Sequence, residues 1–216
     1  MTIDIDNLIQ SITESINRID YIKADEIPNI ELYMDQVTRF FDERLRSTTR
    51  NKDEDKILTK TMINNYAKNN LMPPPDKKKY SKEHMYVLIV IYYFKNVLSI
   101  NDIDSVLRPL REHCVKNEGS RFSLEDVYEG IRKTAENLTE SIKEDLLETY
   151  HTASEIFPDA DGDDKEFLTQ FSFITLLVLD VYIKKLLIEK LIDGYNEKMS
   201  DYVNKDNNSN DKNKKK

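Results

Sequence analysis

Glycine and proline are scarce in this chain, with four and six among 216 residues. Because both residues interrupt helices, their scarcity favours a mainly helical protein, and 39% hydrophobic residues suffice for a sizeable core. The single cysteine, Cys114, excludes a disulfide framework and a cysteine-based metal cluster. The longest apolar run, Met85–Phe94, is about half as long as a membrane-spanning helix. The first residues are acidic where a secretory signal would be basic, so we expect a cytoplasmic protein with no membrane partner.

Positive charge is concentrated in one segment. Residues 56–95 contain eight lysines but only Asp76 and Glu83 as acids, a charge of +6 in a chain of net charge -8. Such local asymmetry is typical of a surface that meets a polyanion. A solvated lysine face beside an acidic patch of the same molecule would have the same composition, so charge alone leaves both interpretations open.

Apolar periodicity and capping residues divide the chain into four parts. These are an N-terminal amphipathic helix (1–26), a helix-turn-helix domain (27–115), a C-terminal hairpin of two long helices (116–200) and a disordered tail (201–216). In the hairpin, Ser123 is expected to open the first helix, and an acidic turn at 158–167 separates it from the second.

Within residues 27–115, helices are expected after Asp35 as N-cap, over about 59–70 with Thr59 or Thr61 as cap, and over about 82–96. The last of these is apolar almost all round and therefore central. A polar loop at 46–56 separates the first two helices.

Prolines mark two breaks in this domain. Pro73–Pro75 cannot be helical, so the chain leaves the second helix in a fixed direction, with at most a small hairpin at 72–80. A further helix is expected to open at Ser99 with Asp102, and Pro109 is expected to end or kink it.

The order of helix, turn, helix, proline-stiffened basic turn and core helix is that of a winged helix-turn-helix. In such a domain the second helix enters the major groove and the basic turn contacts phosphates. Asparagine can pair bidentately with adenine, and lysine neutralises phosphate. The candidate nucleic-acid-binding residues are Lys60, Thr61, Asn64, Asn65, Lys68, Lys77, Lys78 and Lys79.

Two family resemblances support this interpretation. The stretch MINNYAKNNLMPP resembles the recognition-helix segment of the MerR family, which reads roughly TIRYYERKGLLPP. Residues 27–110 resemble more closely the bacterial family known as domain of unknown function 1836, through YMDQVT, ILTKTMINNY, PPPDKKKYSKEH and IYYFK. The resemblance implies an all-α fold, with a MerR-like (winged) helix-turn-helix module followed by a C-terminal long helical hairpin, and no assigned activity.

Departures from the MerR pattern leave two functions open. The family's threonine and arginine that contact the DNA backbone are replaced by Met62 and Asn64. Residues 56–95 contain no arginine, the commonest partner of guanine. We favour a transcriptional regulator that binds double-stranded DNA; the alternative is a helical protein–protein interaction module that kept the fold and lost DNA binding.

No catalytic or metal-binding arrangement is evident, so we expect neither an enzyme nor a cofactor or metal. His84, His113 and His151 lie far apart in sequence, and the acidic turn at 158–167 lacks the spacing of a calcium loop. We interpret that turn as capping the last helix. The last helix has an apolar face wide enough for two partners, which favours core packing plus a homodimer through the C-terminal helices. A small apolar ligand pocket there stays an alternative.

Overall fold

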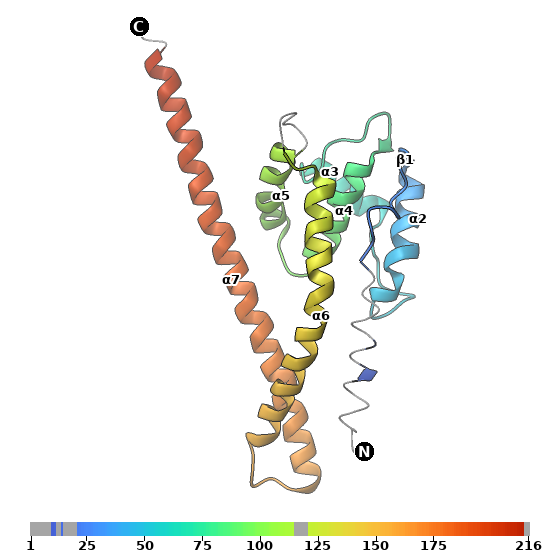
Figure 1. The fold of residues 1–216 in the computed structure, drawn as a ribbon, viewed down its shortest axis with the longest axis vertical. Helices are drawn as coiled ribbons and strands as arrows, with labels where there is room; N and C mark the ends of the chain where they lie inside the picture. Colours follow the sequence, from blue (N-terminus) through green and yellow to red (C-terminus); the bar gives the residue numbers. More distant parts are fainter. Residues whose placement is uncertain (1–9, 12–13, 15–20, 115–120, 214–216) are drawn as a thin grey trace.

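The computed structural model describes residues 10–11, 14, 21–114 and 121–213, which are mostly helical with one two-stranded sheet (Figure 1). The expected all-α class is thereby confirmed. The expected N-terminal helix lies largely outside the described residues, and residues 21–30 form turns and bends. In the part of the chain that the structure describes, no helix combines the length and apolarity needed to cross a membrane.

The first helix of the domain begins earlier than expected. Strand β1 (Leu32–Tyr33) runs directly into α2 (Met34–Leu45), with Tyr33 as the N-cap. The Tyr33 backbone N–H donates to the Gln36 side chain at 2.8 Å, which satisfies one donor at the helix end. Asp35 is therefore not the N-cap; it lies in the first turn, where its carboxylate pairs with Lys60.

Local hydrogen bonds define both ends of α3 (Lys60–Lys68). Thr59 caps the start, its hydroxyl accepting from the Met62 N–H at 3.2 Å. At the other end Asn70 takes a left-handed conformation with φ 57°, and the Leu71 N–H donates back to the Tyr66 carbonyl at 2.9 Å. This Schellman arrangement, with buried Leu71 beyond it, ends the helix before the prolines.

The proline segment leads into a tight turn at residues 76–79. Lys77 and Lys78 both have positive φ, 46° and 66°, and the Lys79 N–H donates to the Asp76 carbonyl at 2.8 Å. This is the pattern of a type I′ turn. Strand β2 (Lys79–Tyr80) then pairs antiparallel with β1. The expected hairpin is thus reduced to the Asp76–Lys79 bridge, because the main partner strand lies far earlier in the chain.

Helix α4 (Lys82–Phe94) is the centre of the core, as its all-round apolar sequence predicts. Eight of its residues are buried. All of them except His84 belong to one hydrophobic cluster with residues of α2, α3, β2, α5 (Ile100–Cys114) and the start of α6 (Leu124–Glu155). This cluster includes Leu124 and Tyr128, so the core extends past residue 115, the expected end of the domain.

His84 joins the start of α4 to the proline segment. Its Nδ1 lies 3.0 Å from the Ser81 backbone nitrogen, and its Nε2 lies 3.2 Å from the Pro73 carbonyl oxygen. A backbone N–H only donates and a carbonyl only accepts, so the ring is neutral, with its proton on Nε2. Burial is the main reason why the pKa of His84 is lowered from 6.5.

Helix α5 (Ile100–Cys114) opens as expected, with the Ser99 hydroxyl accepting from the Asp102 N–H at 3.2 Å. It does not end at Pro109, which lies inside the helix. An interior proline costs about 3 kcal/mol. Burial of the apolar stripe that includes Ile103 and Leu107 offsets this cost.

Two long helices complete the molecule and form a hairpin that opens away from its turn (Figure 1). Ser123 caps α6 (Leu124–Glu155), and α7 (Gly162–Asn213) begins with two acids in its first turn, as the capping interpretation of the acidic segment predicts. The helix also includes residues 201–213 of the tail that we expected to be disordered. Extending an existing helix needs no new nucleation, so a polar tail can continue it.

His84 predicts a pH-dependent stability. Its pKa is lower in the folded state, so the unfolded chain binds more protons and stability falls as the pH decreases below about 6.5. The His84→Gln variant keeps a capping side chain but removes both the hydrogen bond to the Pro73 carbonyl and the group that titrates. We expect a loss of about 1 kcal/mol at pH 7.5 and a weaker pH dependence in urea unfolding. His151→Gln, on an exposed site, is the control; equal pH profiles for wild type and His84→Gln would contradict the assignment.

Candidate nucleic-acid interface

Helix α3 presents one polar face to solvent, because burial fixes its rotation. Ile63 and Tyr66 are buried in the core, one turn apart. The opposite face carries five of the eight candidate residues, and all five are exposed: Lys60, Thr61, Asn64, Asn65 and Lys68. The sequence therefore predicted correctly which side of this helix faces outward.

The two asparagines on this face differ in their surroundings. The Asn69 side chain donates to the Asn65 carbonyl at 2.8 Å and to the Asn65 Oδ1 at 3.1 Å. The Asn64 amide makes no hydrogen bond within the described residues. Only Asn64 thus offers its whole amide edge to an external partner.

Residues 31–35, at the start of α2, contact both α3 and the 76–79 turn. Lys60 at the start of α3 pairs with Asp35. On the other side, the Lys79 ammonium lies 3.4 Å from a Glu31 carboxylate oxygen and 5.9 Å from the centre of the Tyr33 ring. The structure thus brings α3 and the basic turn to the same short segment, residues 31–35, although two of the predicted lysines already have acidic partners.

Lys77 and Lys78 stand at the tip of the turn, where both are exposed. Neither forms an ion pair or a side-chain hydrogen bond within the described part of the chain, and the same holds for Lys68. These three are the candidate lysines that have no acidic partner among the described residues.

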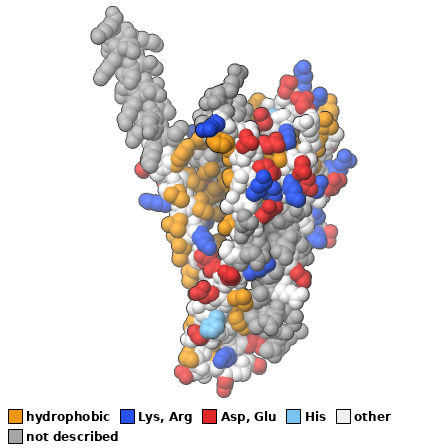
Figure 2. Space-filling view, viewed as in Figure 1, with side chains coloured by type: hydrophobic (Ala, Val, Ile, Leu, Met, Phe, Trp, Pro, Cys, Tyr) orange, Lys and Arg blue, Asp and Glu red, His pale blue; other side chains and the backbone are white. Residues whose placement is uncertain are grey.

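Two further lysines of the basic segment point elsewhere. The Lys82 ammonium lies 3.0 Å from a Glu125 carboxylate oxygen on α6. The Lys95 ammonium donates to the Ile57 carbonyl at 2.6 Å, and burial lowers its pKa. The charge of +6 counted along the sequence therefore overstates the charge on the surface, and Figure 2 shows basic and acidic side chains interspersed there.

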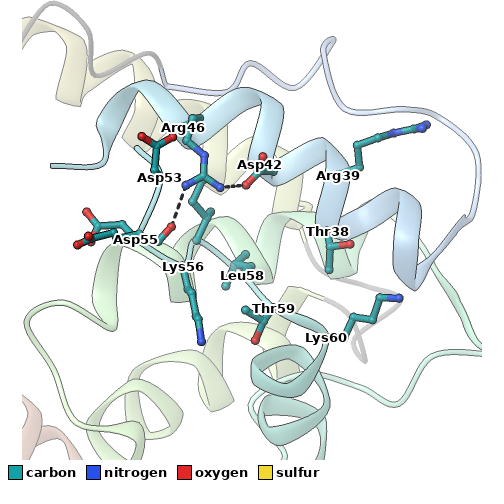
Figure 3. A pocket seen from close by; sticks show the side chains of 12 residues that line it. Thr38, Arg39, Asp42, Arg46, Asp53, Asp55, Lys56, Leu58, Thr59 and Lys60 are labelled. Carbon is teal, nitrogen blue, oxygen red and sulfur yellow. Dashed lines mark hydrogen bonds and ion pairs between the residues drawn. The ribbon is translucent and has the colours of Figure 1, made fainter. Parts of the chain in front are cut away.

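The polar loop between α2 and α3 borders an open cleft of about 570 Å³ at the start of α3 (Figure 3). The Arg46 guanidinium folds this loop back onto α2: it donates to the Lys52 carbonyl at 2.6 Å and to the Asp55 carbonyl at 2.8 Å, and it pairs with Asp42. The loop that joins α2 to α3 is therefore held in place by one arginine side chain.

Sequence reasoning missed two arginines near α3. Arg39 of α2 lines the same cleft as Lys60 and is exposed, although it precedes the segment in which we looked for arginine. Arg111 of α5 donates to the Asn70 carbonyl at the end of α3 and lies 3.1 Å from Asp104. Nothing in the sequence links residues 70 and 111, so only the fold reveals this second contact.

Among the described residues, no group of three or more histidine, cysteine, aspartate or glutamate side chains is arranged to hold a metal ion. His84 is engaged with Ser81 and Pro73, and His151 lies on the exposed side of α6. The side chains of His113 and Cys114 lie outside the described part.

Hydrogen bonds hold residues 22–24, at the start of the domain, against the first turns of α6. The Tyr128 hydroxyl donates to the Ile22 carbonyl at 2.5 Å, and the Ala24 N–H donates to the Glu129 carboxylate at 2.9 Å. Fold and surface together define an all-helical protein whose compact N-terminal domain, with its small sheet, presents a polar helix to solvent.

Residues 22–131 match the family described as Domain of unknown function (DUF1836), and the chain belongs to that family. The first residue of the matched segment, Ile22, accepts the hydrogen bond from Tyr128, which lies near the last matched residue. No curated protein and no solved structure matches the chain.

The 76–79 turn predicts a gain in stability on mutation. Left-handed conformations suit Asn and Gly better than lysine, and Asn-Gly is the preferred pair for a type I′ turn. We expect Lys77→Asn/Lys78→Gly to raise the free energy of unfolding by about 1 kcal/mol. Urea unfolding measures the change, and Lys68→Ala on a regular helix is the control. An unchanged or lower stability of the double variant would show that these lysines are not strained.

Proposed function

We propose that this protein binds double-stranded DNA as a cytoplasmic transcriptional regulator, through a MerR-like winged helix-turn-helix in which α3 is the recognition helix. The observation that carries the proposal is the outward face of α3. Buried Ile63 and Tyr66 lock the helix so that Thr61, Asn64 and Lys68 project together from the surface. A helix held in this way suits the major groove, which accommodates one α-helix.

The 76–79 turn supports the same proposal as a shortened wing. Its two tip lysines have no acidic partner within the described residues, and they occupy backbone conformations that favour other residue types. Strained residues at an exposed turn are typical of functional positions. We assign Lys77 and Lys78 to phosphate contacts, together with Lys68.

Asn64 is the residue that we propose to read a base. An asparagine amide can accept from the N6 amino group of adenine and donate to its N7. In this structure the Asn65 amide already accepts from Asn69, whereas Asn64 has both of its amide groups available. A homodimer through the C-terminal helices belongs to the proposal as well, because two half-sites on DNA match a twofold symmetric protein.

One observation favours the alternative, a protein–protein interaction module. Lys60 and Lys79 are paired with acids, so the surface alternates in sign, as protein interfaces commonly do. Such a module would bind a partner of mixed charge and show little affinity for DNA.

The salt dependence of DNA binding tests the proposal. Each lysine that contacts phosphate adds about 0.9 to the slope of log affinity against log salt. We expect Lys77→Ala/Lys78→Ala/Lys79→Ala to lower that slope by about 2, because Lys77 and Lys78 are the two assigned phosphate contacts among them. Fluorescence anisotropy on genomic fragments measures the slope. The matched control replaces three exposed lysines elsewhere, Lys133, Lys165 and Lys190, and so has the same net charge. Absence of binding at low salt, or equal slopes for both triple variants, would refute the regulator.

Asn64 and Asn65 predict different effects on sequence preference. Asn64→Ala should cost about 1 to 3 kcal/mol of discrimination at one A·T pair, whereas Asn65→Ala should change it little. Selection of preferred sequences from a random DNA pool by each variant measures this. A larger effect of Asn65→Ala would contradict the assignment of base reading to Asn64.

A further inference from the structure

Helix α7 exposes an unusual amount of apolar surface. Between Phe167 and Tyr195, thirteen large hydrophobic side chains of this helix are exposed. In Figure 2 hydrophobic side chains gather along α7 and on the surface beside it. Their combined exposed area is on the order of 1,000 Å², whereas the largest patch on a typical monomer is roughly 300–600 Å². This sum exceeds the share of about 800 Å² that each partner contributes to a stable interface.

The same chain covers only part of α7: α6 contacts it near the hairpin turn, and α5 contacts it further along. Near the hairpin turn, the Phe173 ring packs on Tyr150 of α6 at 5.4 Å between ring centres. Further along, Ile192 is buried and the Asn196 amide donates to Ser105 of α5 at 3.2 Å. The remaining apolar positions of α7 have no comparable cover within the described residues.

The side of α7 that faces α6 is itself left open. Leu191 follows Phe173 by about five helical turns and so lies on the same side of the helix. Yet Leu191 is 74% exposed, Leu187 one turn earlier is 60% exposed, and Ile131 at a similar height on α6 is 66% exposed. The two helices diverge, and no side chain in the described part of the chain fills the space between them.

Beside the exposed Ile131, an apolar cavity of about 510 Å³ lies between α4, α5 and α6. Val90, Phe94, Leu110 and Ile131 are among the residues that line it. A hydrophobic helix inserted beside α6 would cover this cavity and the inner side of α7 together.

The charged residues of α7 are compatible with burial of its apolar side chains against a partner helix. The Lys184 ammonium lies 2.7 Å from Asp180, and the Lys185 ammonium lies 3.7 Å from Glu189, each pair one turn apart on the same helix. A partner packed against the neighbouring apolar positions therefore leaves these charges matched within the helix. A lipid surface would instead be expected to meet a predominantly basic polar face.

We propose that the occupant is α7 of a second copy, and that each α7 enters the opening between α6 and α7 of the other. The result is a four-helix bundle with twofold symmetry, in which α7 has its own α5 and α6 on one side and the partner's α6 and α7 on the other. This arrangement accounts for a helix that is apolar almost all round. The parallel orientation, with both N-terminal domains at one end, rests on the proposed binding of two DNA half-sites.

The oligomeric state of the full chain without DNA tests the dimer. Sedimentation equilibrium at micromolar concentration should give the mass of two chains. Leu187→Lys/Leu191→Lys should give one chain with an unchanged helical circular dichroism spectrum. The control, Ile30→Lys/Val97→Lys, adds two lysines at exposed apolar sites outside α7 and should stay dimeric. A monomeric wild type, or a dimeric Leu187→Lys/Leu191→Lys, would overturn the proposal.

Cross-linking tests the reciprocal insertion. In a Cys114→Ser background, one preparation carries Ile131→Cys and another carries Leu187→Cys, and the two are mixed under mild oxidation. A disulfide that joins the two kinds of chain can form only between copies, so its appearance at high yield supports the arrangement. A dimer without this cross-link would overturn it. Neither measurement involves DNA, so a failure here is distinguishable from a failure of the regulator hypothesis.

Discussion

The burial of α4 is the constraint on which the rest of the structure depends. A helix that is apolar almost all round needs cover on most sides, and here α2, α3, β2, α5 and the start of α6 supply it, while Val90 and Phe94 line the cavity between α4, α5 and α6. His84 anchors its first turn to the proline segment, so the core helix and the basic turn are positioned together. The placement of the candidate interface is therefore a consequence of core packing rather than of the surface residues themselves.

Helix caps and a tight turn, each formed by residues close in sequence, fix the orientation of the side chains in the candidate interface. Thr59 starts α3, Asn70 ends it in a left-handed conformation, and the turn at Lys77 and Lys78 reverses the chain at once. Arg111 reaches from α5 to the carbonyl of Asn70, which ties the end of α3 to a distant helix. A surface held from both ends can present Asn64 and Lys68 in a fixed geometry, as groove recognition requires.

The two halves of the chain use hydrophobic residues for different purposes. In the N-terminal domain they are enclosed, and Tyr128 and Glu129 of α6 close it against residues 22–24. Along α7 most of them face solvent, and no other described part of the same chain covers them. A dimer through α7 would join two such domains, and DNA binding through paired domains would then depend on the same helix.

The sequence by itself determined the features that arise within a few residues. Capping and periodicity, whose hydrogen bonds span three or four residues, predicted the helix starts near residues 59, 82 and 123, the central role of α4 and the outward face of α3. For α3 the sequence left Thr59 and Thr61 open as the cap, and the structure has Thr59. The motifs between residues 27 and 110 likewise identified the family.

Tertiary structure alone decided which charges are available and where the domain closes. Lys60, Lys79, Lys82 and Lys95 are engaged by groups that lie 25 to 48 residues away in sequence, and β2 finds its partner in β1. Pro109 stays inside a helix because buried neighbours offset its cost. Such contacts depend on the packing of whole elements, and a local pattern carries no information about which distant element will lie beside it.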